Sequence, residues 1–136
     1  GETFVGDVSE IRSDVPVHPE GGKIRPREPR ERLRTMVQEG LGPCRSGTGL
    51  RRFLEALEEW KASFPSLKAE GPMDLLHALE MKGLTCTAEA VARAALLREE
   101  SRGVHFREDF PEEREELKSR ILVSSVHGKL AAAREE

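Results

Sequence analysis

The side chains best suited to chemistry are concentrated in residues 98–111, which read Arg-Glu-Glu-Ser-Arg-Gly-Val-His-Phe-Arg-Glu-Asp-Phe-Pro. The arginines and the histidine supply donors, and the acidic residues supply acceptors, around a glycine and before a proline. The planar guanidinium of arginine suits bidentate contacts with carboxylates or phosphates. Two interpretations follow from the residues alone. Either a polar network docks the end of a helix onto a neighbouring domain, or Arg102 or His105 holds an anionic substrate.

A second stretch, residues 42–49, superficially resembles a nucleotide-binding loop but lacks its defining residues. It reads Gly-Pro-Cys-Arg-Ser-Gly-Thr-Gly, without the Lys followed by Ser or Thr that a phosphate loop needs. A dinucleotide-binding loop is also excluded, because Arg52 stands where its third glycine belongs. We therefore predict a turn between helices and the start of a helix.

The histidines and cysteines show no spacing typical of a metal site or a disulfide framework. The four histidines are scattered, and the spacing of His77 and Glu80 predicts a solvated or interhelical contact. Cys44 is predicted to be a packing cysteine. We assign no catalytic, metal-binding or cofactor-binding residue in this segment.

Three helices must position the polar stretch. Apolar residues at helical spacing predict the first over about residues 30–41 and the second over residues 50–64. The third opens at Pro72 and continues through an alanine-rich segment, with Gly83 as a kink or a break. Three helices joined by short breaks favour an up-down bundle, which we assign to residues 30–111.

The two ends of the chain have a different character. Prolines and glycines make residues 1–29 an extended arm or linker. The tail, residues 112–136, contains a helical turn over 112–117 and a strand over 120–126, with a turn at His127-Gly128. The predicted fold class is thus all-α, a three-helix up-down bundle with an extended N-terminal arm and a short C-terminal strand or hairpin.

The composition limits the partners and the location. Charged residues make up 35% of the chain, aromatic residues 4%, and the formal net charge is -3. This balance gives no global attraction to nucleic acid or to an anionic membrane. No apolar run approaches the roughly 20 residues of a membrane span. We expect no nucleic-acid partner, no direct membrane insertion and a cytoplasmic location.

Ordered motifs resemble the C-terminal helical domain of the succinate dehydrogenase and fumarate reductase flavoproteins. The first is Leu-Arg-Thr-Met-Val at 33–37, followed by Gly-Pro-Cys-Arg at 42–45 and Gly-Leu at 49–50. The others are Asp-Leu-Leu-His-Ala-Leu-Glu at 74–80, and an alanine-rich helix at 88–98 leading into Glu-Ser-Arg-Gly-Val-His at 100–105. L-Aspartate oxidase shares this domain and is the alternative. Beyond Pro111 the resemblance is weaker, because Glu116 and Ser119 stand near positions where family members carry Trp and His.

The resemblance implies a spectrin-repeat-like three-helix bundle that packs against the flavin-binding and capping domains of a parent protein. An iron–sulfur subunit is a further implied partner, and partner subunits would provide any membrane association. In this family, hydride passes between the flavin and the C2–C3 bond of succinate or fumarate. This segment lacks the flavin fingerprint, so we expect FAD in the parent protein and no cofactor here.

Under this resemblance the segment has a structural role, bracing the flavin domain. We assign the interdomain docking contacts to Arg98, Ser101, Arg102, His105 and Arg107. The competing class of function is a standalone helical module that binds a protein partner through its charged faces.

Overall fold

The computed structural model describes residues 25–64, 71–126 and 129–135. The elements in chain order are α1 (Arg27–Gly40), β1 (Cys44–Arg45), α2 (Gly47–Ala62), α3 (Pro72–Leu97), β2 (Phe106–Arg107), the 3-10 helix η3 (Glu115–Leu117), β3 (Ile121–Val126) and β4 (Lys129–Arg134). Most of the predicted arm, residues 1–24, and the predicted His127-Gly128 turn lie outside the described residues.

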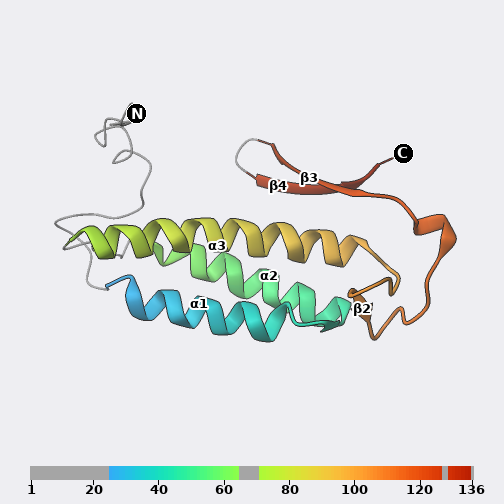
Figure 1. Cartoon of the computed structure of the whole chain (residues 1–136), viewed down its shortest axis with the longest axis horizontal. Helices are drawn as coiled ribbons and strands as arrows, with labels where there is room; N and C mark the ends of the chain where they lie inside the picture. Colours follow the sequence, from blue (N-terminus) through green and yellow to red (C-terminus); the bar gives the residue numbers. More distant parts are fainter. Residues whose placement is uncertain (1–24, 65–70, 127–128, 136) are drawn as a thin grey trace, which may run out of the picture.

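Three helices form the body of the molecule (Figure 1). α1 and α3 run in one direction and α2 runs in the other, which is the up-down order that the sequence predicts. Apolar side chains from all three helices meet in a core of Leu33, Phe53, Leu57, Met81, Ala88 and Ala92. Burying one Leu or Phe side chain stabilises a fold by about 1.5–3 kcal/mol, so this core is the main source of stability for the bundle.

Two small two-stranded sheets accompany the helices, so the molecule is mostly helical and the all-α class is too narrow. β1 pairs with β2 in parallel, with Cys44 opposite Phe106. β3 and β4 form an antiparallel hairpin, with Ile121 opposite Arg134, that lies along α3 on the side away from α1 (Figure 1). This confirms the predicted C-terminal hairpin. The alanine-rich sequence of β4 hides its strand character, because alanine is depleted in strands.

The helix starts have local causes. α1 begins at Arg27, earlier than the sequence predicts, because Pro26 at its N-cap holds a φ of -64° that already suits a helix. α2 begins after Ser46, whose Oγ accepts a hydrogen bond from the Gly49 N–H at 3.1 Å. The turn and helix start predicted for residues 42–49 are thereby confirmed.

α3 continues through Gly83 without interruption, so the predicted break at this glycine is wrong. A glycine in a helix interior costs about 1 kcal/mol relative to alanine. The turns on either side bury Met81 and Ala88 in the core, and this packing outweighs the local preference.

A few polar features complete the fold. Glu89 of α3 is buried and forms ion pairs with Lys61 of α2 and with Arg93. Cys44 is exposed, contrary to the predicted packing role, because the alternation along β1 directs Arg45 inward instead. None of the described helices combines the length and the apolarity needed to cross a membrane.

Candidate functional site

The candidate site is the segment 98–111, which we call the return loop because it leaves α3 and folds back across the ends of α2 and α3. Its tip is a tight turn at Gly103 and Val104, closed by backbone hydrogen bonds of 2.8 and 3.1 Å between Arg102 and His105. Gly103 has a φ of 60°, a left-handed conformation that favours glycine. The tip is therefore a tight two-residue hairpin turn with Val104 at its end.

Arg107 anchors the return loop to the end of α3. Its side chain is only 2% exposed. Nη1 donates to the carbonyl oxygens of Ala95, Leu96 and Arg98 at 2.8, 3.2 and 3.0 Å. These carbonyls belong to the last turn of α3 and to its C-cap residue Arg98, where backbone acceptors lack partners within the helix. A cation at this position also complements the negative end of the helix dipole.

Asp109 links Arg107 to the N-terminus of α2. Its two carboxylate oxygens each accept a hydrogen bond of 2.8 Å from the Arg107 guanidinium. Oδ2 also accepts from the backbone N–H of Gly47, the first residue of α2, at 2.9 Å. Arg107 and the Gly47 N–H hold the pKa of Asp109 well below its usual range. One ion pair thus joins the C-terminus of α3 to the N-terminus of α2.

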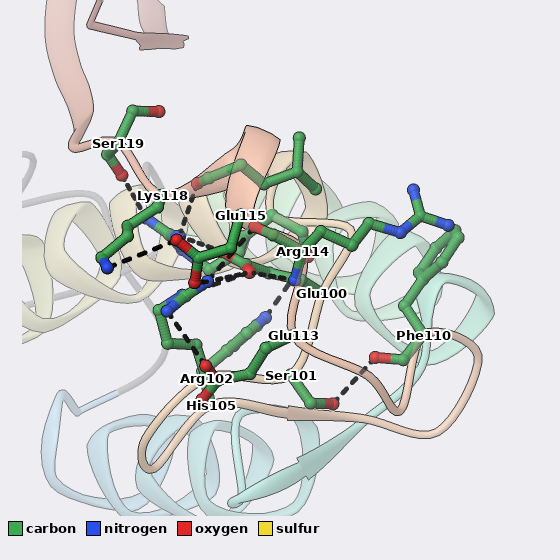
Figure 2. Close-up of polar contacts among 12 residues, drawn as sticks. Glu100, Ser101, Arg102, His105, Phe110, Glu113, Arg114, Glu115, Lys118 and Ser119 are labelled. Atoms are coloured by element: carbon green, nitrogen blue, oxygen red, sulfur yellow. Dashed lines mark hydrogen bonds and ion pairs between the residues drawn. The ribbon is translucent and has the colours of Figure 1, made fainter.

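Glu100 is the second buried centre, because its side chain is fully buried. Figure 2 shows it among Arg102, Glu115 and Arg114. It accepts hydrogen bonds from Arg98 at 2.6 Å, from Arg102 at 3.0 and 3.1 Å, and from the Arg114 backbone N–H at 3.0 Å. Burial alone would raise its pKa, but these donors outweigh burial and lower the pKa to about 2. Arg98 also donates to the carbonyl of Ser119, so the network reaches the segment before β3.

Ser101 forms hydrogen bonds with backbone groups on both sides of the return loop. Its buried Oγ accepts from the Arg107 N–H at 2.8 Å and donates to the Phe110 carbonyl at 2.8 Å (Figure 2). Its own N–H donates to the carbonyl of Glu112. A single small residue therefore satisfies backbone groups on both sides of the loop.

His105 is held as a neutral imidazole. Its Nδ1 lies 2.8 Å from Nη1 of Arg45, and its Nε2 lies 3.3 Å from the carbonyl oxygen of Arg98. Since a guanidinium can only donate, Nδ1 accepts, and the ring proton sits on Nε2. Burial lowers the pKa of His105, and the nearby arginines act in the same direction. Both ring nitrogens are engaged in fixing the loop to β1 and α3.

The five residues predicted to dock are thus brought together, but each has contacts within this chain. Ser101 and Arg107 are buried, whereas Arg98, Arg102 and His105 are partly exposed. Sequence reasoning grouped the charges correctly and missed their partners. The spacing offered a signal: residues two apart in an extended segment lie on the same side, which pairs Arg107 with Asp109.

The part of the chain that the structure describes offers no candidate metal site. Within residues 25–64, 71–126 and 129–135, no group of three or more His, Cys, Asp or Glu side chains could hold a metal ion. Glu80 forms an interhelical ion pair of 2.5 Å with Arg30 of α1, which is one of the two kinds of contact predicted for His77 and Glu80.

Comparisons with known proteins point in one direction. Residues 30–135 match the family described as "Fumarate reductase flavoprotein C-term", so the likeness includes the tail beyond Pro111. An uncharacterised FAD-dependent oxidoreductase of Methanocaldococcus jannaschii is 37% identical over 68% of this chain and 17% of its own length. One component of the fumarate reductase (CoM/CoB) of Methanothermobacter marburgensis is 37% identical over 76% of this chain and 20% of its own length. A chloroplastic L-aspartate oxidase of Nicotiana tabacum is 38% identical over 74% of this chain and 16% of its own length.

The three-dimensional structure gives the same result. A chain of the Mycobacterium smegmatis Sdh1 complex in the apo form superposes with a TM-score of 0.78 and 25% identity, over 94% of this chain and 23% of that one. The present chain therefore spans about a fifth of the length of the relatives it matches.

Proposed function

Because this chain belongs to the fumarate reductase flavoprotein C-terminal family, we propose that it braces the flavin-binding domain of an FAD-dependent oxidoreductase. The parent enzyme would be of the succinate dehydrogenase and fumarate reductase type, with FAD and the reacting groups on neighbouring domains. The observation that carries this proposal is the return loop, whose buried charged side chains, Glu100 and Arg107, have their ion-pair partners within this chain. Such a loop is suited to positioning a neighbour, because its own conformation costs nothing to fix on docking.

We assign the docking edge to the return loop, with a division of labour among the predicted residues. Ser101 and Arg107 hold the loop in shape from inside. Arg98, Arg102 and His105 are partly exposed, and Arg102 and His105 flank the tip, where Val104 is 92% exposed. An apolar side chain on a rigid polar rim is typical of an interface anchor.

The partners we propose are the flavin-binding and capping domains, with an iron–sulfur subunit in the assembled enzyme. The likeness to a chain of the Sdh1 complex supports a setting with several subunits. The location would be cytoplasmic, or at a membrane through partner subunits. An L-aspartate oxidase is the second candidate for the parent enzyme. The 38% identity to the Nicotiana tabacum protein supports this alternative.

The test is Val104→Asp in the flavoprotein that carries this domain. A charge at an anchor that docking would bury should weaken docking by roughly tenfold to a hundredfold, and FAD per polypeptide should fall after gel filtration. In the 136-residue chain alone, the same variant should change the free energy of unfolding by less than about 0.5 kcal/mol, because the side chain is exposed.

Met73→Asp is the matched control, an exposed apolar residue near the opposite end of α3 that should leave the FAD content unchanged. Arg102→Ala should lower both the FAD content and the stability of the domain, since it removes two hydrogen bonds from Glu100. Full FAD retention in Val104→Asp would exclude the return loop as the docking edge.

A further inference from the structure

The β3–β4 hairpin has an open edge along β3. The Glu135 N–H donates to the Arg120 carbonyl at 2.9 Å, and these two residues continue the hairpin register by one position, opposite each other. Opposite residues in an antiparallel pair alternate between hydrogen-bonded and non-hydrogen-bonded positions. The backbone groups of Ile121, Val123 and Ser125 therefore point away from β4. No other strand among the described residues lies beside them.

This edge lacks the features that usually prevent pairing with a further strand. Natural proteins protect open edges with charged residues, prolines or bulges. β4 begins with Lys129 and ends with Arg134, whereas β3 reads Ile-Leu-Val-Ser-Ser-Val, without a charge or a proline. The register of the hairpin is continuous, so β3 has no bulge. An uncharged strand rich in β-branched residues is a ready template for another strand.

An apolar surface lies beside the open edge. The hairpin lies along the C-terminal half of α3 (Figure 1), with a cavity on each side. Ala132 of β4 lines one cavity, and Ile121 of β3 lines the other, which has a volume of about 290 Å³. In the second cavity α3 contributes Val91, which is 41% exposed, together with Ala94 and Ala95. Its other lining residues are Arg45, Arg98 and His105.

The open edge and the apolar surface fit the same kind of occupant. A strand beside β3 would bond to the outward backbone groups of Ile121, Val123 and Ser125. Alternate side chains of a strand point to the same face of a sheet, so every second side chain of that strand would lie over Val91 and Ala94. Backbone hydrogen bonds would then supply affinity, and the side chains over α3 would supply specificity.

We infer that β3 pairs with an extended segment of the parent flavoprotein, which adds a third strand to the hairpin. The inference rests on the proposed function, because the occupant comes from the rest of the parent chain. The match covers only 17% and 20% of the length of two relatives, so most of such a polypeptide lies outside these residues. A segment tethered to the same polypeptide meets the edge at a higher effective concentration than a free partner does.

The first test is hydrogen exchange of the β3 amides, measured by mass spectrometry with fragmentation. In the 136-residue chain, β4 should protect the amides of Leu122 and Ser124, whereas those of Ile121, Val123 and Ser125 should exchange rapidly. In the flavoprotein that carries this domain, the latter three amides should exchange at least about tenfold more slowly.

Two results would overturn the inference. Equally rapid exchange of the Ile121, Val123 and Ser125 amides in the flavoprotein would show that no strand is added. Slow exchange of these amides already in the 136-residue chain would show that this chain, or a second copy of it, covers the edge.

Two adjacent serines provide a matched pair of variants. Ser125→Pro removes an N–H that points to the open edge, so the hairpin of the 136-residue chain should keep its protection. In the flavoprotein, the same variant should speed exchange at Val123 by roughly tenfold, because the added strand loses a donor and meets the proline ring. Ser124→Pro removes an N–H that faces Ala131, so protection of the hairpin should fall in both proteins.

The variants can also contradict the inference. Loss of hairpin protection in the Ser125→Pro form of the 136-residue chain would show that this N–H does not point to an open edge. Unchanged exchange at Val123 in the Ser125→Pro flavoprotein would show that its slow exchange there does not come from an added strand.

Failure of this inference is distinguishable from failure of the proposed function. The FAD content of Val104→Asp reports on the return loop, whereas the exchange of the β3 amides reports on the added strand. Full FAD retention in Val104→Asp, with slow exchange at Val123 in the unmodified flavoprotein, would exclude the return loop and support the added strand. Loss of FAD in Val104→Asp, with rapid exchange at Val123 in the unmodified flavoprotein, would support the docking edge and overturn the added strand.

Discussion

The helical bundle and the return loop both contain buried side chains, but opposite chemistries hold them. The bundle core consists of Leu, Phe, Met and Ala side chains from three helices. The return loop has almost no apolar interior, and its fully or nearly buried side chains are Glu100, Ser101 and Arg107. The bundle is stabilised by the apolar surface that folding removes from water, and the return loop is stabilised by directed hydrogen bonds.

This difference determines how each region responds to change. An apolar core loses stability in proportion to the atoms removed and tolerates swaps of similar volume. A buried ionic network fails when one partner is removed, since the remaining charge is left uncompensated. We expect the return loop to be the more brittle of the two regions, although it contains far fewer side chains.

The largest expected effect is that of Arg107→Ala. The change leaves Asp109 without its ion pair and uncaps the last turn of α3. We expect the free energy of unfolding to fall by about 3–5 kcal/mol in urea titrations of the isolated chain. Arg107→Lys should recover only part of this loss, because an ammonium cannot make the bidentate contact with Asp109. A loss below about 1 kcal/mol would show that the network contributes little.

The second expected effect is a dependence on pH. The folded pKa of Glu100 is lowered from 4.5 to about 2, and that of Asp109 is lowered as well. Groups with depressed pKa values contribute stability that is complete above their unfolded values and is lost as the pH falls toward the folded ones. The domain should therefore lose stability between about pH 4.5 and pH 2, which thermal unfolding at several pH values would measure.

Two variants, one in the return loop and one in the bundle core, test which region causes the loss of stability at low pH. Glu100→Gln should lower stability at about pH 7 and flatten the dependence on pH below 4.5, because one of the titrating groups is gone. Leu57→Ala, a core change, should lower stability by about 2–5 kcal/mol at every pH and leave the shape of the curve unchanged. The pKa of Glu89 is also lowered, so some acid sensitivity should remain in Glu100→Gln. An unaltered pH curve in Glu100→Gln would contradict the assignment.

The sequence predicts these two regions unequally. Apolar residues at helical spacing are a local pattern, so the three helices and core members such as Leu57 could be identified from it. The return loop could be recognised as polar and dense, and its spacing could pair Arg107 with Asp109, but its backbone partners on α2 and α3 could not be identified. Arg107 contacts carbonyls of α3 and reaches α2 through Asp109, and such long-range hydrogen bonds to backbone atoms leave no trace in residue spacing.

Gly83 and β4 show a second limit of local reasoning. A glycine within a helical pattern and an alanine-rich strand both contradict local propensity, and packing decides both cases. α3 continues because its neighbouring turns are buried, and β4 forms because β3 supplies its hydrogen bonds and α3 supports the hairpin.

The smallest expected effects are those of alanine substitutions at two glycines, Gly47 beside the return loop and Gly83 in the helical bundle. A Cβ at Gly47 would lie 2.9 Å from Oδ2 of Asp109 and 3.1 Å from Nη2 of Arg107, so Gly47→Ala must displace the ion pair and should cost about 1–3 kcal/mol. A Cβ at Gly83 would meet nothing within 4 Å, and Gly83→Ala should stabilise the chain by about 0.5–1 kcal/mol, because alanine is the better helix former. Urea titrations of both variants should give changes of opposite sign. If Gly47→Ala were also stabilising, the ion pair could shift at no cost, and the return loop would not be the brittle region that its buried charges imply.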